Sequence, residues 1–88
     1  MSYASLLKNA IKEADLSLGQ ICRRVNRNGL KLHPAVLSKM QNGKHPPARD
    51  EVNIALAKVL EIDVGRLRVE AIKQILPKDL IKLIQEVS

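Results

Sequence analysis

Side chains with hydrogen-bonding groups recur at helical spacing near the middle of the chain. Ala35, Ser38, Lys39 and Asn42 stand at positions i, i+3, i+4 and i+7 of one segment, so they share one face of a helix. A hydroxyl, an ammonium and an amide group can hydrogen-bond to the edges of bases, and the alanine methyl group can contact thymine. A helix with such a small polar face fits a DNA major groove, which is ~12 Å wide. We therefore expect these four residues to read bases.

Positive charge is concentrated around this segment. The 88 residues carry a formal net charge of +6, and residues 1–49 hold nine basic and two acidic side chains, a net charge of +7. No acidic residue occurs at the 34 positions between Asp15 and Asp50. A localised basic surface attracts polyanions such as nucleic acid, whose phosphates acidic side chains would repel, although charge alone also fits a solvated face without a partner. We expect phosphate contacts from Ser17, Gln20, Arg23, Arg24, Arg27, Lys31, His33 and Lys44.

The composition excludes several other kinds of site. Tyr3 is the only aromatic residue, which excludes an aromatic stacking platform for single-stranded nucleic acid. Cys22 is the only cysteine, which excludes a disulfide framework, and we expect it to be a packed core thiol. We find no nucleophile–base pair, no glycine-rich phosphate loop and no carboxylate cluster with metal-ligand spacing. The sequence therefore predicts no enzymatic activity, no metal and no cofactor.

The length and the distribution of apolar residues predict one soluble domain. No apolar run reaches the ~18 residues that a membrane span needs. The first residues lack the basic stretch and apolar core of a signal peptide. We therefore expect a cytoplasmic chain without a membrane partner.

Apolar residues recur with helical periodicity through nearly the whole chain, which predicts an all-α fold. The first amphipathic helix covers Tyr3–Ala14. Ser17 is a good N-cap for a second helix, and Gln20 completes a capping box three residues later. Asn28-Gly29 ends this helix, because glycine accepts the left-handed backbone conformation. Residues 30–32 then form a short extended link.

The third helix carries the base-reading face. Pro34 fits its first position, where a missing N–H loses no hydrogen bond, and Asn42-Gly43 ends it. Three further helix starts are expected, at Arg49 or Asp50, at Asp63 and after Pro77. Ile72 and Ile75 fall on the predicted apolar face of the fifth helix.

Two stretches of the sequence resemble a known family. Residues 17–22, SLGQIC, and residues 36–44, VLSKMQNGK, are similar to the helix-turn-helix of the lambda-repressor/Cro class, also called the xenobiotic-response-element family. The resemblance covers about residues 3–69. It implies a compact five-helix DNA-binding bundle over residues 1–69, with the third helix as recognition helix, and leaves residues 70–88 as an additional C-terminal helical extension. Members of this family are transcription regulators and are often dimeric.

The chain departs from the family pattern at three places. Residues 27–31 look like an insertion between the second and third helices, and Leu18 stands where the family often has a glutamine that reaches a phosphate. Pro34 and Ala35 occupy early recognition-helix positions that are usually polar. The insertion and the apolar pair favour an alternative function, in which the same fold binds another regulatory protein as an antirepressor or adaptor. The main hypothesis remains a sequence-specific regulator of double-stranded DNA, a repressor of bacterial or phage type.

The C-terminal tail is rich in large aliphatic residues. Residues 72–87 hold eight of them in sixteen positions, and in the last helix they spread too widely for one intramolecular stripe. We expect a two-fold homodimer in which residues 77–87 of each chain pair. The alternative is a tail that packs on its own domain. The expected interface residues are Leu80, Ile81, Leu83, Ile84 and Val87.

Overall fold

The described residues form helices joined by turns and loops. The computed structural model describes residues 2–76 and 78–87, without the side chains of residues 78, 79, 81 and 87. Within these ranges there are six helices and no strand: α1 (Tyr3–Ala14), α2 (Leu18–Asn26), α3 (Pro34–Gln41), α4 (Asp50–Val59), α5 (Val64–Ile75) and α6 (Lys78–Val87). The predicted all-α fold is confirmed. No helix of the described ranges is both long enough and apolar enough to cross a membrane.

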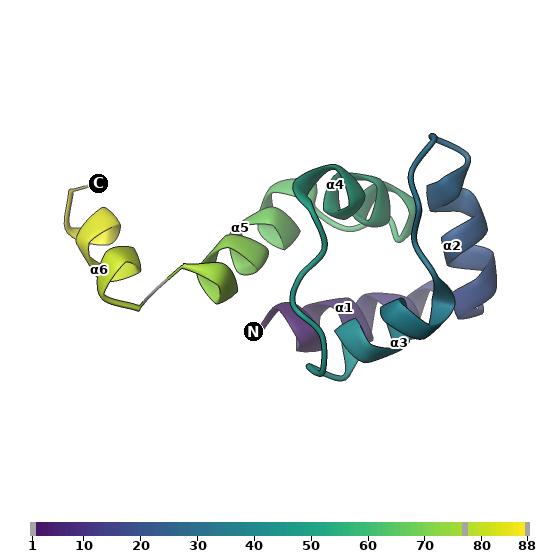
Figure 1. Cartoon of the computed structure of the whole chain (residues 1–88), viewed down its shortest axis with the longest axis horizontal. Coiled ribbons are helices and arrows are strands. Elements are labelled where there is room, and N and C mark those ends of the chain that lie inside the picture. The colour runs from purple at the N-terminus through teal and green to yellow at the C-terminus, as the bar shows by residue number, and fades with distance from the viewer. Residues whose placement is uncertain (1, 77, 88) are drawn as a thin grey trace.

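The first five helices pack into a bundle, and α6 lies beyond the end of α5 (Figure 1). α1 packs on α3 and α5, and α4 packs on α2 and α5. The molecule measures 40 × 23 × 21 Å, and its long axis runs through α6 (Figure 1).

One apolar core joins the five helices of the bundle. Each helix contributes a completely buried side chain: Leu7, Ile21, Leu37, Leu56 and Leu67. Cys22 is also buried with a free thiol, as expected, and this burial raises the pKa of the thiol. Because the core draws on α1 through α5, the positions of α2 and α3 depend on packing across the whole bundle.

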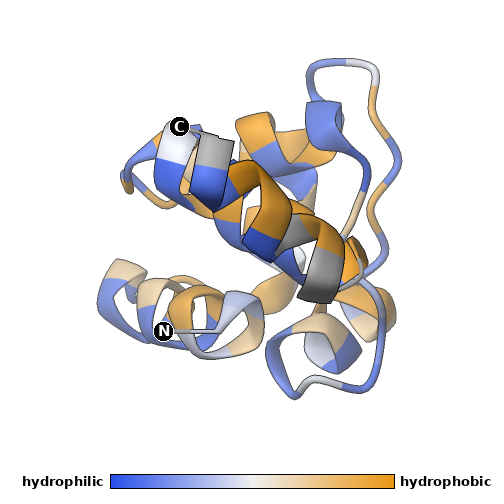
Figure 2. Ribbon diagram, turned by 90° about the vertical axis from the view of Figure 1, so that its left-hand side faces the viewer, coloured by the Kyte–Doolittle hydropathy of each residue, from blue (hydrophilic) through white to orange (hydrophobic). Residues whose placement is uncertain are grey.

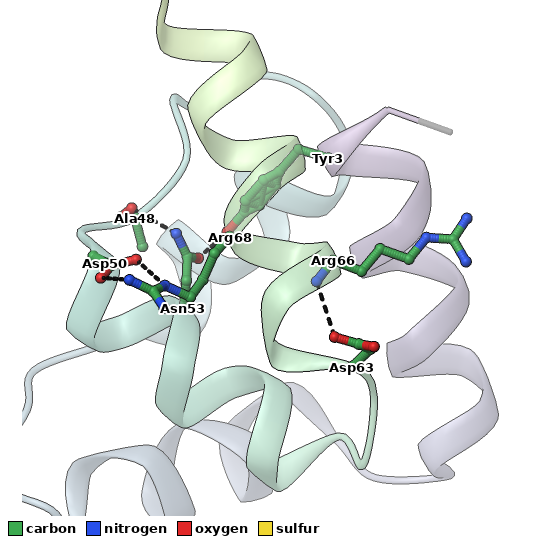
Figure 3. A network of polar contacts seen from close by, with 7 residues as sticks. All are labelled: Tyr3, Ala48, Asp50, Asn53, Asp63, Arg66 and Arg68. Atoms are coloured by element: carbon green, nitrogen blue, oxygen red, sulfur yellow. Dashed lines mark hydrogen bonds and ion pairs between the residues drawn. The ribbon is translucent and has the colours of Figure 1, made fainter. Parts of the chain in front are cut away.

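Local sequence signals set where the helices begin. The Ser17 hydroxyl oxygen accepts a bond from the Gln20 amide (3.1 Å), and Gln20 Oε1 accepts one from the Ser17 amide (2.9 Å), so the predicted capping box is confirmed. Asp63 caps α5 by accepting from the Arg66 amide at 3.0 Å (Figure 3). Pro34 is the first residue of α3, as predicted.

Left-handed backbone ends several helices. Gly29 (φ 80°) and Gly43 (φ 71°) follow α2 and α3, at the predicted positions. Asp15 (φ 55°) and Glu61 (φ 56°) adopt the same conformation after α1 and α4. For a residue with a Cβ atom this conformation costs roughly 1–2 kcal/mol, so these two acidic residues carry local strain.

A buried polar network ties α1 to α4. The Tyr3 hydroxyl donates to Asn53 Oδ1 at 2.6 Å, and Asn53 Nδ2 donates to the Ala48 carbonyl at 2.8 Å (Figure 3). Asn53 is 1% exposed. Burial raises the pKa of Tyr3 to about 12. Because Ala48 belongs to the connector between α3 and α4, this network also fixes the segment that leaves α3.

The second half of α5 differs from the sequence prediction. Leu67 and Ala71 are buried, but Ile72 is 49% exposed and Ile75 is 63% exposed. α5 packs against α1 and α4, and its end, after the buried Ala71, extends past the bundle (Figure 1). The expected domain boundary between residues 69 and 70 falls inside this continuous helix.

Candidate nucleic-acid interface

The outer face of α3 carries the four expected base-reading residues. Leu37 and Met40 point into the core, which turns the opposite face of the helix outward. Ala35, Lys39 and Asn42 are exposed, and Ser38 is half-buried. The structure therefore brings the four onto one accessible face.

Asn42 is held in place by neighbours on two helices. Its Nδ2 atom donates to the Ser38 carbonyl at 2.9 Å, and its Oδ1 atom accepts from Lys8 Nζ at 3.3 Å. Contact with a base would require Asn42 to exchange its bond to Lys8, an exposed side chain of α1. Sequence reasoning missed Lys8, because 34 residues separate it from Asn42 and no local pattern links the two.

The outer face of α2 is strongly basic. Gln20, Arg23, Arg24 and Arg27 line one shallow polar hollow, and all four are exposed. The ion pairs of the described residues join Arg68 to Asp50 at 2.8 Å and Lys73 to Glu70 at 3.7 Å. These pairs lie on α4 and α5, so within the described residues no ion pair engages the guanidinium groups of α2, although Glu13 and Glu61 line a hollow together with Arg24. Such a face suits phosphate oxygens, which arginine binds well.

An amide clasp closes the linker between α2 and α3. Asn26 Oδ1 accepts from the Leu32 amide at 2.8 Å, and Asn26 Nδ2 donates to the Leu32 carbonyl at 3.1 Å. The residues suspected to be an insertion, 27–31, thus form a loop that leaves α2 and returns to its last turn. The exposed side chains of Arg27 and Lys31 lie on this loop. Because these two bonds hold Leu32 at the last turn of α2, α3 begins beside the end of α2 despite the extra residues.

His33 and Lys44 lie at opposite ends of α3. His33 Nδ1 accepts from the Ala35 amide at 3.2 Å, which confirms the capping interpretation of this histidine. A neutral ring that accepts at Nδ1 carries its proton at Nε2 and keeps a donor there. At the other end, the Lys44 amide donates to the Lys39 carbonyl at 2.8 Å, which holds Lys44 against the last turn of the helix.

The expected interface residues of the tail are only partly described. Leu80, Leu83 and Ile84 are exposed on α6. The side chains of Ile81 and Val87 lie outside the described residues.

Comparison with known proteins finds no match to a family model, to a curated protein or to a solved structure.

Proposed function

We propose that this chain is a helix-turn-helix protein of the lambda-repressor/Cro type that binds double-stranded DNA and regulates transcription, without enzymatic activity. The observation that carries the proposal is the charge of the surface around α3. All seven lysine and arginine residues between Asp15 and Asp50 are exposed, and this stretch contains no acidic residue. Lys8 of α1 adds a further cation beside the end of α3. Phosphate contacts supply the sequence-independent part of DNA affinity.

In the proposed mechanism, phosphates position the protein and α3 reads bases. The amino-terminal ends of α2 and α3, capped by Ser17 and His33, direct the positive ends of the helix dipoles towards phosphates. Side chains of the surrounding basic surface add further phosphate contacts. Ser38, Lys39 and Asn42 hydrogen-bond to base edges, and Ala35 contacts a thymine methyl group.

We extend the proposal to a homodimer that acts as a repressor of bacterial or phage type in the cytoplasm. α3 has only eight residues, so a monomer covers few base pairs. Two copies on half-sites about one helical turn apart, ~34 Å, double the contacts. The exposed apolar side chains of α6 support association of this kind.

The decisive experiment selects bound sequences from a random duplex pool. We expect one enriched site. We also expect the logarithm of the binding constant to fall linearly with the logarithm of the salt concentration. Lys39→Ala should lose about 1–3 kcal/mol of discrimination between that site and random duplex. Arg23→Ala should weaken both duplexes equally and reduce the salt slope by about one unit. Lys58→Ala, an equal charge change on the exposed side of α4, is the matched control.

A second candidate function is an antirepressor or adaptor that binds another regulator. The exposed apolar side chains of α5 and α6 favour it, because large apolar patches mark protein-binding surfaces. Weak duplex binding without salt dependence would favour this function over the first.

A further inference from the structure

The exposed large apolar side chains of the described residues gather at one end of the molecule. All lie on α5 from Val69 onwards or on α6, and each is between 41% and 63% exposed: Val69, Ile72, Ile75, Leu80, Leu83 and Ile84. Together they expose on the order of 500 Å² of apolar surface, close to the ~300–600 Å² of the largest patch on a typical monomer. Figure 2 views the molecule from this end and shows orange, apolar segments on α6, the helix nearest the viewer.

The contact between α5 and α6 leaves an apolar hollow open. This hollow of about 170 Å³ is lined by Val69 and Ile72 of α5, by Leu76 directly after α5, and by Ile84 of α6, together with Lys73 and Gln85. Val69 and Ile72 each remain 49% exposed, so α6 of the same chain covers the outer face of α5 only in part.

The backbone at Leu76 ends α5. Leu76 is extended, with φ −77° and ψ 145°, as expected for a residue that precedes a proline. α6 therefore starts as a separate helix beyond the end of α5 (Figure 1), and its Ile84 lines the hollow together with Val69 and Ile72. As a result, α6 covers the outer face of α5 only in part, and both helices keep exposed apolar side chains.

We propose that the occupant of the outer face of α5 is α6 of a second copy of this chain, placed reciprocally across a two-fold axis. This inference rests on the dimer of the proposed function and replaces simple α6–α6 pairing with α6 seated on the partner's α5. A two-fold axis fits this arrangement, because each copy provides both α6 and the α5 face on which the partner's α6 packs.

The spacing of the two apolar stripes supports this packing. Val69 and Ile72 of α5 stand at i and i+3, and Leu80, Leu83 and Ile84 of α6 stand at i, i+3 and i+4, which are spacings of helices that interdigitate side chains. Ile75 lines a separate hollow beside residues 43–47, so covering the other exposed apolar side chains on both copies removes on the order of 900 Å² of apolar surface. With the polar rim, this approaches the ~1,200–2,000 Å² of stable interfaces.

Disulfide trapping between two single-cysteine chains tests the geometry without DNA. In a Cys22→Ala background, one chain carries Ile72→Cys and a second chain, with an affinity tag, carries Ile84→Cys. We expect mild oxidation of the mixture to give mainly the mixed disulfide. A dominant disulfide between two Ile84→Cys chains would show α6–α6 pairing and overturn the proposal, as would the absence of disulfides. Lys58→Cys mixed with Ile84→Cys is the control for random collision.

Sedimentation of the full chain at micromolar concentration provides a second test. Ile72→Asp should raise the dimer dissociation constant at least tenfold and leave the helix content unchanged, because the residue is half exposed. Gln74→Asp, an exposed site outside the hollow, should leave the constant unchanged. A monomeric wild type, or equal constants for the two variants, would overturn the proposal. Duplex binding is measured separately, so a dimer that does not bind DNA contradicts the proposed function and leaves this inference standing.

Discussion

Replacing Tyr3 with phenylalanine isolates one buried hydrogen bond. The substitution keeps the ring and removes the hydroxyl group that donates to Asn53 Oδ1 at 2.6 Å. Tyr3 is 2% exposed and Asn53 is 1% exposed, so water cannot replace the lost donor. Leaving a buried acceptor unsatisfied costs about 1–3 kcal/mol. In a domain of this size, each kcal/mol lowers the melting temperature by roughly 4–8 °C.

The same substitution should change how stability depends on pH. Burial raises the pKa of Tyr3 from 10.0 to about 12. Above about pH 10 the unfolded chain therefore releases the tyrosine proton while the folded chain still retains it, so rising pH favours unfolding. Between these two pKa values the free energy of unfolding falls by about 1.4 kcal/mol per pH unit. The total loss is about 2–3 kcal/mol once the pH exceeds the pKa of the folded protein. The phenylalanine variant has no such proton, so the advantage of the wild type should shrink above pH 10.

Urea unfolding of both proteins at about pH 8 and about pH 11 measures this difference. Titration of the lysines occurs in both proteins and cancels in the comparison. Tyr3 is the only aromatic residue, so the near-ultraviolet absorbance of tyrosinate reports its ionisation alone. A tyrosine that titrates near pH 10 in the folded protein, or a stability difference that stays constant across this range, would refute the reasoning.

Further substitutions test three local features of the fold. Asn26→Ala removes both bonds to the Leu32 backbone and should lower the free energy of unfolding by about 1–3 kcal/mol, whereas Asn28→Ala should change it by less than about 0.5 kcal/mol in the same urea titration. Glu61→Gly and Asp15→Gly relieve left-handed strain and should each raise the stability by about 0.5–1 kcal/mol; a decrease in melting temperature for both would contradict this account. Ser17→Ala breaks the capping box and should cost about 1 kcal/mol in thermal unfolding, and an unchanged melting temperature would show that the cap contributes nothing.

Features that depend on neighbours in the chain could be predicted from the sequence. The capping box at Ser17, the start of α3 at Pro34 and its end at Asn42-Gly43 agree with the structure. Each depends on backbone groups within about four residues, whose preferences are set by local sterics and hydrogen bonding. The outward face of α3 was predictable for the same reason, because helical spacing alone decides which residues share a face.

Contacts between distant segments could not be predicted in this way. Tyr3 meets Asn53 across 50 residues, and Lys8 meets Asn42 across 34; these pairs exist only because packing of the bundle brings their helices together. The fifth helix shows the same limit, since the periodicity that correctly buried Leu67 also placed Ile72 inward, where the structure exposes it. Periodicity defines an apolar face, but whether that face is covered depends on where the neighbouring helices end in space.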